Sequence, residues 1–105
     1  MSVLADYEEA LAITERMLEC ARAAQWDRLV ELERERSGTM QRLRQRDPDP
    51  GRDTATRERK RVVLKRMIAC DEEIAVLTQD WMGELRQILS AVDTTNKLAR
   101  TYRAR

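Results

Sequence analysis

Residues 63–92 read VLKRMIACDEEIAVLTQDWMGELRQILSAV, and this stretch decides the fold. Its apolar residues recur mostly in alternating steps of four and three, as they do along the seam of a coiled coil. This stripe comprises Val63, Met67, Cys70, Ile74, Leu77, Trp81, Leu85, Ile88 and Val92. We therefore expect one long helix over about residues 53–92, with Asp53 or Thr54 as its N-cap.

Two further helical patterns precede this stretch. Apolar residues three and four apart predict a helix over about residues 3–24, with Ser2 as N-cap, and a second helix over about residues 26–46. A tight corner near Gln25 separates them. The segment DPDPGR, residues 47–52, forms a loop after the second helix, because each proline removes a backbone N–H and disfavours a helical residue before it.

The polar cluster Asp93-Thr94-Thr95-Asn96 supplies several residues that favour helix caps. We expect the third helix to end there, and the C-terminal segment 94–105 to form a short helix or a mobile tail. The first two helices together are about as long as the third. The predicted fold is all-α, an antiparallel helical hairpin packed on one long helix, in a single domain of residues 1–105.

The composition supports this fold class and argues against enzymatic chemistry. The chain has 105 residues, of which 37% are charged and 4% aromatic, so it suits one small helical domain rather than a sheet. It contains no His, which is the commonest acid/base group near neutral pH and the commonest metal ligand. We expect no enzymatic activity, no metal site and no cofactor.

The two cysteines and the terminal sequence point to the cytoplasm. Cys20 and Cys70 form neither a CxxC pair nor a disulfide framework, so each is expected to act as a small apolar side chain in a reducing compartment. The N-terminus lacks a basic region followed by an apolar run, and no stretch is long and uncharged enough to span a membrane. The expected location is cytoplasmic, without membrane insertion.

The arginine-rich block from Arg34 to Arg66 is the strongest charge feature. It has the residues to contact phosphates, but no aromatic side chain lies within it to stack bases, and acidic residues are interspersed. The net charge of the whole chain is only +1. We interpret the block as a solvated face and expect no nucleic-acid binding. A nucleic-acid-associated protein or a structural helical dimer that uses this block remains the alternative.

The long helix has a second stripe of apolar residues beside the one that is expected to pack on the other two helices. A helix in a small bundle buries only part of its circumference, so side chains of this stripe are expected at the surface. An exposed apolar groove with adaptable Met side chains suits a helical binding partner or a dimer interface. The predicted groove residues are Leu64, Ile68, Ala75, Met82 and Leu89.

Several segments together resemble the flagellar chaperone FliT family. They are MLECARAAQWDRLVELE at residues 17–33, IACDEEI at 68–74, GEL at 83–85, and the late pair Leu98 and Tyr102. The order and spacing of these segments carry the resemblance over nearly the whole chain.

The resemblance implies a small helical chaperone of the flagellar type III export apparatus. Such proteins bind the C-terminal segment of the filament-capping protein FliD, so that it does not assemble prematurely in the cytoplasm. Family members also contact the export ATPase complex and the export gate, and in enteric bacteria one represses the flagellar master regulator. By the same resemblance, Tyr102, with Leu98 four residues before it, is the expected export-gate contact. A homodimer is a further possible partner arrangement.

Overall fold

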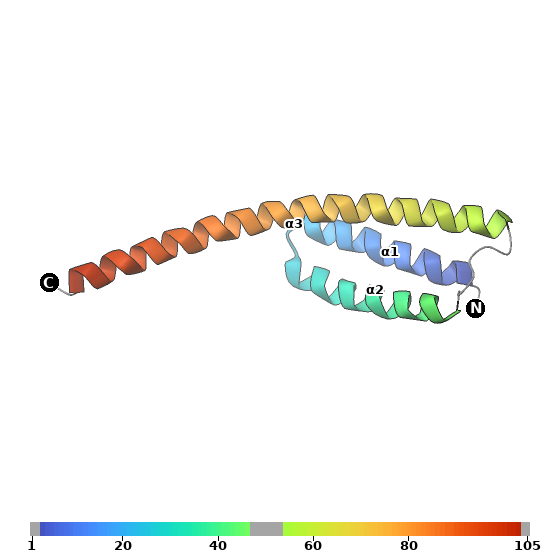
Figure 1. Ribbon diagram of the computed structural model, residues 1–105, viewed down its shortest axis with the longest axis horizontal. Helices are drawn as coiled ribbons and strands as arrows, with labels where there is room; N and C mark the ends of the chain where they lie inside the picture. The colour runs from blue at the N-terminus through green and yellow to red at the C-terminus, as the bar shows by residue number, and fades with distance from the viewer. Residues whose placement is uncertain (1–2, 47–53, 104–105) are drawn as a thin grey trace. The chain divides into compact units, whose positions relative to one another are not determined.

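The computed structural model describes residues 3–46 and 54–103, and these residues form three helices without a strand (Figure 1). Helix α1 spans Val3–Arg22, α2 spans Trp26–Arg46 and α3 spans Thr54–Arg103. The predicted all-α fold is confirmed.

The chain divides into two compact units, and the division falls within α3. The first unit contains α1, α2 and residues 54–75 of α3, which lie side by side (Figure 1). The second unit contains residues 76–103 of α3. Each unit is described by itself.

Ion pairs in the first unit show that α1 and α2 run in opposite directions. Arg42 of α2 pairs with Glu9 of α1 at 3.4 Å, and Arg46, one turn later in α2, pairs with Asp6 at 3.3 Å. Residue numbers therefore rise along one helix as they fall along the other. The antiparallel hairpin is the arrangement that the sequence predicts.

Ion pairs also connect α1 with the first part of α3, and here the two helices run in the same direction. Glu15 pairs with Arg66 at 3.5 Å, and Arg22, about two turns later, pairs with Glu73 at 2.8 Å. Both side chains of each pair are about half exposed or more, so these contacts fix direction rather than contribute much stability.

The core of the first unit is built from all three helices. Cys70 is 2% exposed, and the other three members of the long stripe before Ala75 are also buried. Burial of this apolar surface is the main source of the unit's stability. The buried apolar residues are Ala10, Ile13, Met17, Leu18, Cys20, Ala21, Leu32, Leu43, Val63, Met67, Cys70 and Ile74.

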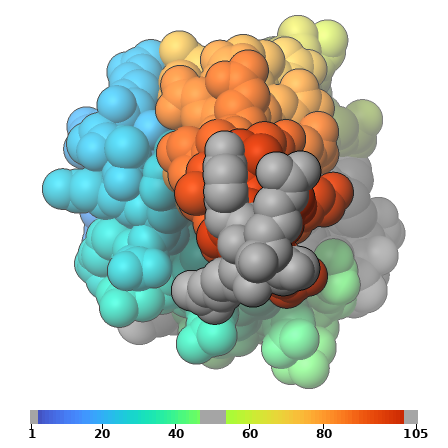
Figure 2. Space-filling view, turned by 90° about the vertical axis from the view of Figure 1, so that its left-hand side faces the viewer, coloured from blue at the N-terminus to red at the C-terminus, as the bar shows by residue number. Residues whose placement is uncertain are grey.

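The corner between α1 and α2 has a left-handed residue that ends α1. Ala24 has a φ of 56°, the N–H of Gln25 donates to the carbonyl oxygen of Cys20 at 2.8 Å, and the N–H of Ala24 donates to that of Ala21 at 3.2 Å. This is the hydrogen-bond pattern of a Schellman motif. The expected corner near Gln25 is present, and α1 ends at Arg22 rather than near Ala24. Figure 2 shows the surface of this corner in blue to cyan.

The expected end of the third helix near Val92 is wrong. Helix α3 continues to Arg103, so residues 94–103 form neither a separate helix nor a tail. Within this helix, the hydroxyl groups of Thr94 and Thr95 donate to the carbonyl oxygens four residues earlier, both at 3.0 Å. Threonines bonded in this way remain inside a helix instead of capping it. Ser2, the loop 47–52 and Asp53, which the sequence analysis also assigns, lie outside the described residues.

The second unit leaves its part of the long apolar stripe largely uncovered. Trp81 and Leu85 are of intermediate exposure, whereas Ile88 is 60% and Val92 52% exposed. Residues 76–103 form a single helix, so the described residues of this unit provide no second element to cover these side chains.

Candidate functional site: a groove between α2 and α3

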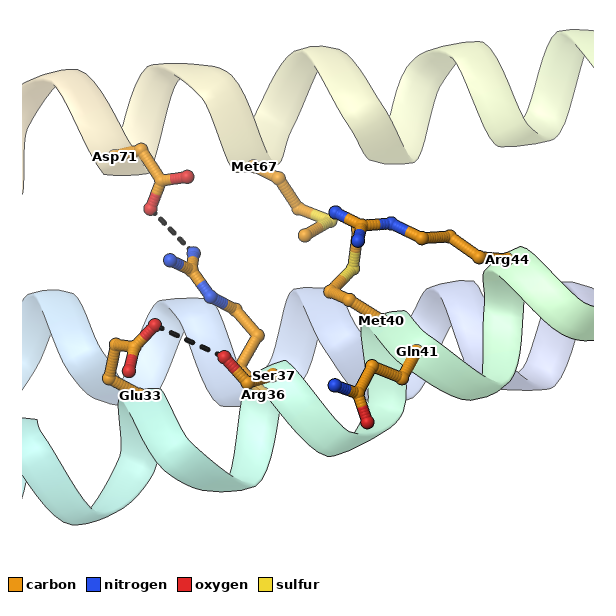
Figure 3. Close-up of a pocket in the computed structure, with 8 residues that line it drawn as sticks. All are labelled: Glu33, Arg36, Ser37, Met40, Gln41, Arg44, Met67 and Asp71. Carbon is orange, nitrogen blue, oxygen red and sulfur yellow. Dashed lines mark hydrogen bonds and ion pairs between the residues drawn. The ribbon is translucent and has the colours of Figure 1, made fainter.

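A hollow of about 290 Å³ lies between α2 and the first part of α3 (Figure 3). Met40 of α2 and Met67 of α3 point toward one another across it, and Arg44 of α2 reaches the same space. Flexible thioether side chains adapt to ligands of varied shape. The lining residues are Glu33, Arg36, Ser37, Met40, Gln41, Arg44, Met67 and Asp71.

A second hollow of about 390 Å³ follows along the same pair of helices toward the α1–α2 corner. It is more apolar than the first, and Met17 of α1 is part of its wall. Val30, one of its lining residues, is 52% exposed and adds apolar surface to the opening of this hollow. The lining residues are Met17, Leu29, Val30, Glu33, Arg36, Asp71, Ile74 and Ala75. We call the two hollows together the α2–α3 groove.

An ion pair separates the two hollows, since Arg36 and Asp71 line both of them. The guanidinium group of Arg36 donates to the carboxylate of Asp71 at 2.6 Å and to the hydroxyl group of Thr14 at 3.2 Å. The Arg36 side chain is only 18% exposed, and that of Asp71 is 46% exposed. The middle of the groove is thus charged but internally neutralised.

A bidentate ion pair between α1 and α3 lies outside the groove. The Arg22 guanidinium donates to both carboxylate oxygens of Glu73, at 2.9 and 2.8 Å. This bidentate hydrogen bonding raises the pKa of Arg22 above its usual value, so the guanidinium group remains charged at any ordinary pH.

Among the predicted groove residues, Ala75 alone lines the α2–α3 groove. In the first unit, Leu64 and Ile68 are exposed at the surface of α3, at 37% and 57%. In the second unit, Met82 is 39% and Leu89 58% exposed. All five side chains are thus accessible, and the structure distributes them over two units.

The residues expected at the export gate lie near the end of α3. Leu98 is 56% exposed, and Tyr102 lies within the last turn of the helix.

The predicted groove residues all lie on α3 and do not include the wall that α2 contributes. Val30 and Met40 belong to the apolar pattern of α2, so the signal was present, but the expected groove was placed on the long helix alone. A groove needs two walls, and the residues facing each other across it depend on the register of two helices. That register is visible here in the pairing of Arg36 with Asp71.

The described residues offer neither a metal site nor a helix that is long and apolar enough to cross a membrane. Both cysteines are free and buried.

Four of the twelve basic residues in the block from Arg34 to Arg66 are neutralised within the first unit. Arg36, Arg42, Arg46 and Arg66 each pair with an acidic side chain of another helix. These pairs weaken the positive field that phosphate binding requires.

Residues 4–104 match the model of a protein family described as "FliT: Flagellar protein FliT". No curated protein and no solved structure matches the chain.

Proposed function

Because this chain belongs to the flagellar protein FliT family, we propose that it binds the C-terminal segment of the filament-capping protein FliD in the cytoplasm, prevents premature assembly of FliD and delivers it to the export apparatus. Membership in the family implies the role of a flagellar export chaperone, and the family is one of chaperones rather than enzymes. FliD, the delivery step and the cytoplasmic location are parts of the proposal.

The observation that supports the proposal best is the exposure of large apolar side chains on α3. Ile68 in the first unit and Leu89 in the second are more than half exposed. Apolar side chains that recur along a helix and stay at the surface mark a binding face. The proposed contacts to FliD are Leu64, Ile68, Ala75, Met82 and Leu89, together with the walls of the α2–α3 groove.

Apolar burial drives the binding in this proposal. Each Å² of apolar surface removed from water contributes about 25 cal/mol, from which the cost of ordering the bound segment is subtracted. A FliD segment covered in this way cannot pair with other FliD subunits. After loading, Leu98 and Tyr102 contact the export gate, and the export ATPase complex and the flagellar master regulator are further proposed partners.

The test is binding of the full chain to a peptide of the C-terminal segment of FliD from the same genome, measured by calorimetry. The double variant Ile68→Asp/Met82→Asp is expected to lower the affinity at least about tenfold, since each charge would have to be desolvated in the interface. Circular dichroism checks that the double variant remains helical. Unchanged affinity of the double variant would place the binding face elsewhere.

A matched control comes from another face of α3. Val62 is 59% exposed, against 57% for Ile68, and a separation of six positions along the helix places the two side chains on different faces. Val62→Asp is therefore expected to leave the affinity for FliD unchanged. An equal loss of affinity in Val62→Asp would show that the introduced charge disturbs the fold of the chain rather than the contact with FliD.

Light scattering of the free chain and of its mixture with the peptide tests the alternative of a structural dimer. The chaperone proposal expects the peptide to form a complex of defined stoichiometry. A dimer that ignores the peptide would contradict it. Binding to nucleic acid that falls steeply with added salt would instead support the alternative based on the block from Arg34 to Arg66.

A further inference from the structure

Opposite charges stand at the two ends of the first hollow of the α2–α3 groove. Glu33 and Arg44 both line it, and Figure 3 shows them at opposite ends. Both residues are exposed, and neither is in an ion pair with another described residue. Glu33 accepts one hydrogen bond, of 3.3 Å, from the hydroxyl group of Ser37. Both charges are thus available to a partner.

The space between these two charges has no net charge. Met40 and Met67 provide its apolar surface, and the charges of Arg36 and Asp71 neutralise one another at 2.6 Å. A partner in this hollow therefore meets a positive end, a neutral middle with two Met side chains, and a negative end.

The spacing of the two charges matches the repeat of an α-helix. Arg44 follows Glu33 by eleven residues, which corresponds to about three turns and about 16 Å along α2. A helix lying along the groove presents residues eleven apart on one face. One acidic and one basic residue at this spacing would face Arg44 and Glu33 together.

The helix dipole favours one of the two possible orientations of such a partner. Acidic residues stabilise the N-terminal turn of a helix and basic residues its C-terminal turn. The favoured partner has its acidic N-terminal end beside Arg44 and its basic C-terminal end beside Glu33. The partner then runs antiparallel to α2 and parallel to the first part of α3. These two helices are themselves antiparallel, because Arg36 pairs with Asp71 and Met40, four residues later, packs against the core cluster that contains Met67.

We propose that the α2–α3 groove takes an amphipathic helix that is acidic at its N-terminal end and basic at its C-terminal end, and that this helix lies parallel to α3. Its apolar side chains between the two charges enter the first hollow, beside Met40 and Met67. The inference rests on the proposed function, because the occupant is the segment of the exported protein that the chaperone binds.

Two model peptides of identical composition test this polarity with the full chain. Both carry Leu at helical spacing; one has Glu near its N-terminal end and Lys eleven residues later, and the other has the two exchanged. At low salt, fluorescence anisotropy is expected to show about three- to tenfold tighter binding of the peptide with N-terminal Glu, the range that a few exposed ion pairs provide. Added salt is expected to reduce this difference.

A charge exchange in the protein provides the decisive variant. Glu33→Arg/Arg44→Glu keeps the net charge and is expected to invert the preference between the two peptides. Arg16→Glu/Glu19→Arg makes the same exchange on α1 with two exposed residues that do not line the groove, and it is expected to leave the preference unchanged.

The outcomes separate this inference from the proposed function. Equal binding of both peptides, or a preference that survives the exchange at Glu33 and Arg44, overturns the inference, as does binding of the FliD segment without binding of either peptide. Failure of both model peptides and of the FliD segment to bind overturns the proposed function as well. A dimer of the free chain that neither peptide displaces would assign the groove to a second copy and overturn the inference.

Discussion

Nη1 of Arg36 donates hydrogen bonds to Asp71 of α3 at 2.6 Å and to Thr14 of α1 at 3.2 Å, so one nitrogen of α2 connects all three helices of the first unit. Thr14 itself is fully buried and donates to the carbonyl oxygen of Ala10 at 2.8 Å. The ion pair of Arg36 and Asp71 also separates the two hollows of the groove.

Removal of this link is expected to destabilise the first unit. Arg36→Ala should lower the free energy of unfolding by about 1–3 kcal/mol, because Asp71 and Thr14 lose a charged donor in a largely buried position. Asp71→Asn should cost less, since its amide oxygen still accepts a hydrogen bond. Urea unfolding followed by circular dichroism measures both. The control is Arg28→Ala, which breaks an exposed pair within α2 and should change stability least. An equal cost for all three variants would contradict the assigned role of Arg36.

Ala24→Gly is expected to stabilise the protein. Ala24 has a φ of 56°, a conformation that is unfavourable for a residue with a Cβ atom and readily adopted by glycine. The gain should be about 1 kcal/mol in thermal or urea unfolding. Ala23→Gly, one residue earlier, is the control and should be neutral or slightly destabilising, because Ala23 does not have a positive φ. A loss of stability in Ala24→Gly would show that the corner differs from the one described.

Truncation of Ile13 should destabilise the protein far more than truncation of Ile88. Ile13 is 0% exposed, so Ile13→Ala is expected to cost about 2–5 kcal/mol through lost burial and the cavity that remains. Ile88 is 60% exposed in the second unit, so Ile88→Ala should change the stability of the isolated chain by less than about 0.5 kcal/mol. Chemical denaturation of the two variants tests this, and a large cost for Ile88→Ala would reveal a contact that covers it in solution.

The continuity of α3 through its threonines can be tested with proline. Thr95→Pro should break the helix, because proline removes a backbone hydrogen bond and clashes with the preceding turn, at a cost of about 3 kcal/mol. Carbon chemical shifts measured by NMR for residues 90–101 should then lose their helical values near the substitution. Thr95→Ala is the control and should retain them. Non-helical shifts for these residues in the unsubstituted chain would instead support a helix that ends near Val92, as the sequence predicts.

The sequence by itself determined the helices, because helix formation depends on local periodicity and on local breaks. The spacing of apolar residues predicted α1 and α2 to within two residues at each described end. It failed at the end of α3, where Thr94 and Thr95 resemble cap residues but bond backward into the helix instead. The same residue types serve both purposes, and only the backbone around them distinguishes the two.

The tertiary structure decided which apolar residues are buried and which remain accessible. Cys70 and Ile88 belong to one stripe with one spacing, yet Cys70 is 2% and Ile88 60% exposed. The first is covered because α1 and α2 pack on its part of α3, whereas the described residues of the second unit contain no other helix. The groove depends in the same way on the register that sets Arg36 opposite Asp71. A periodic pattern specifies a face of a helix, but burial and clefts arise only from the element that packs against that face.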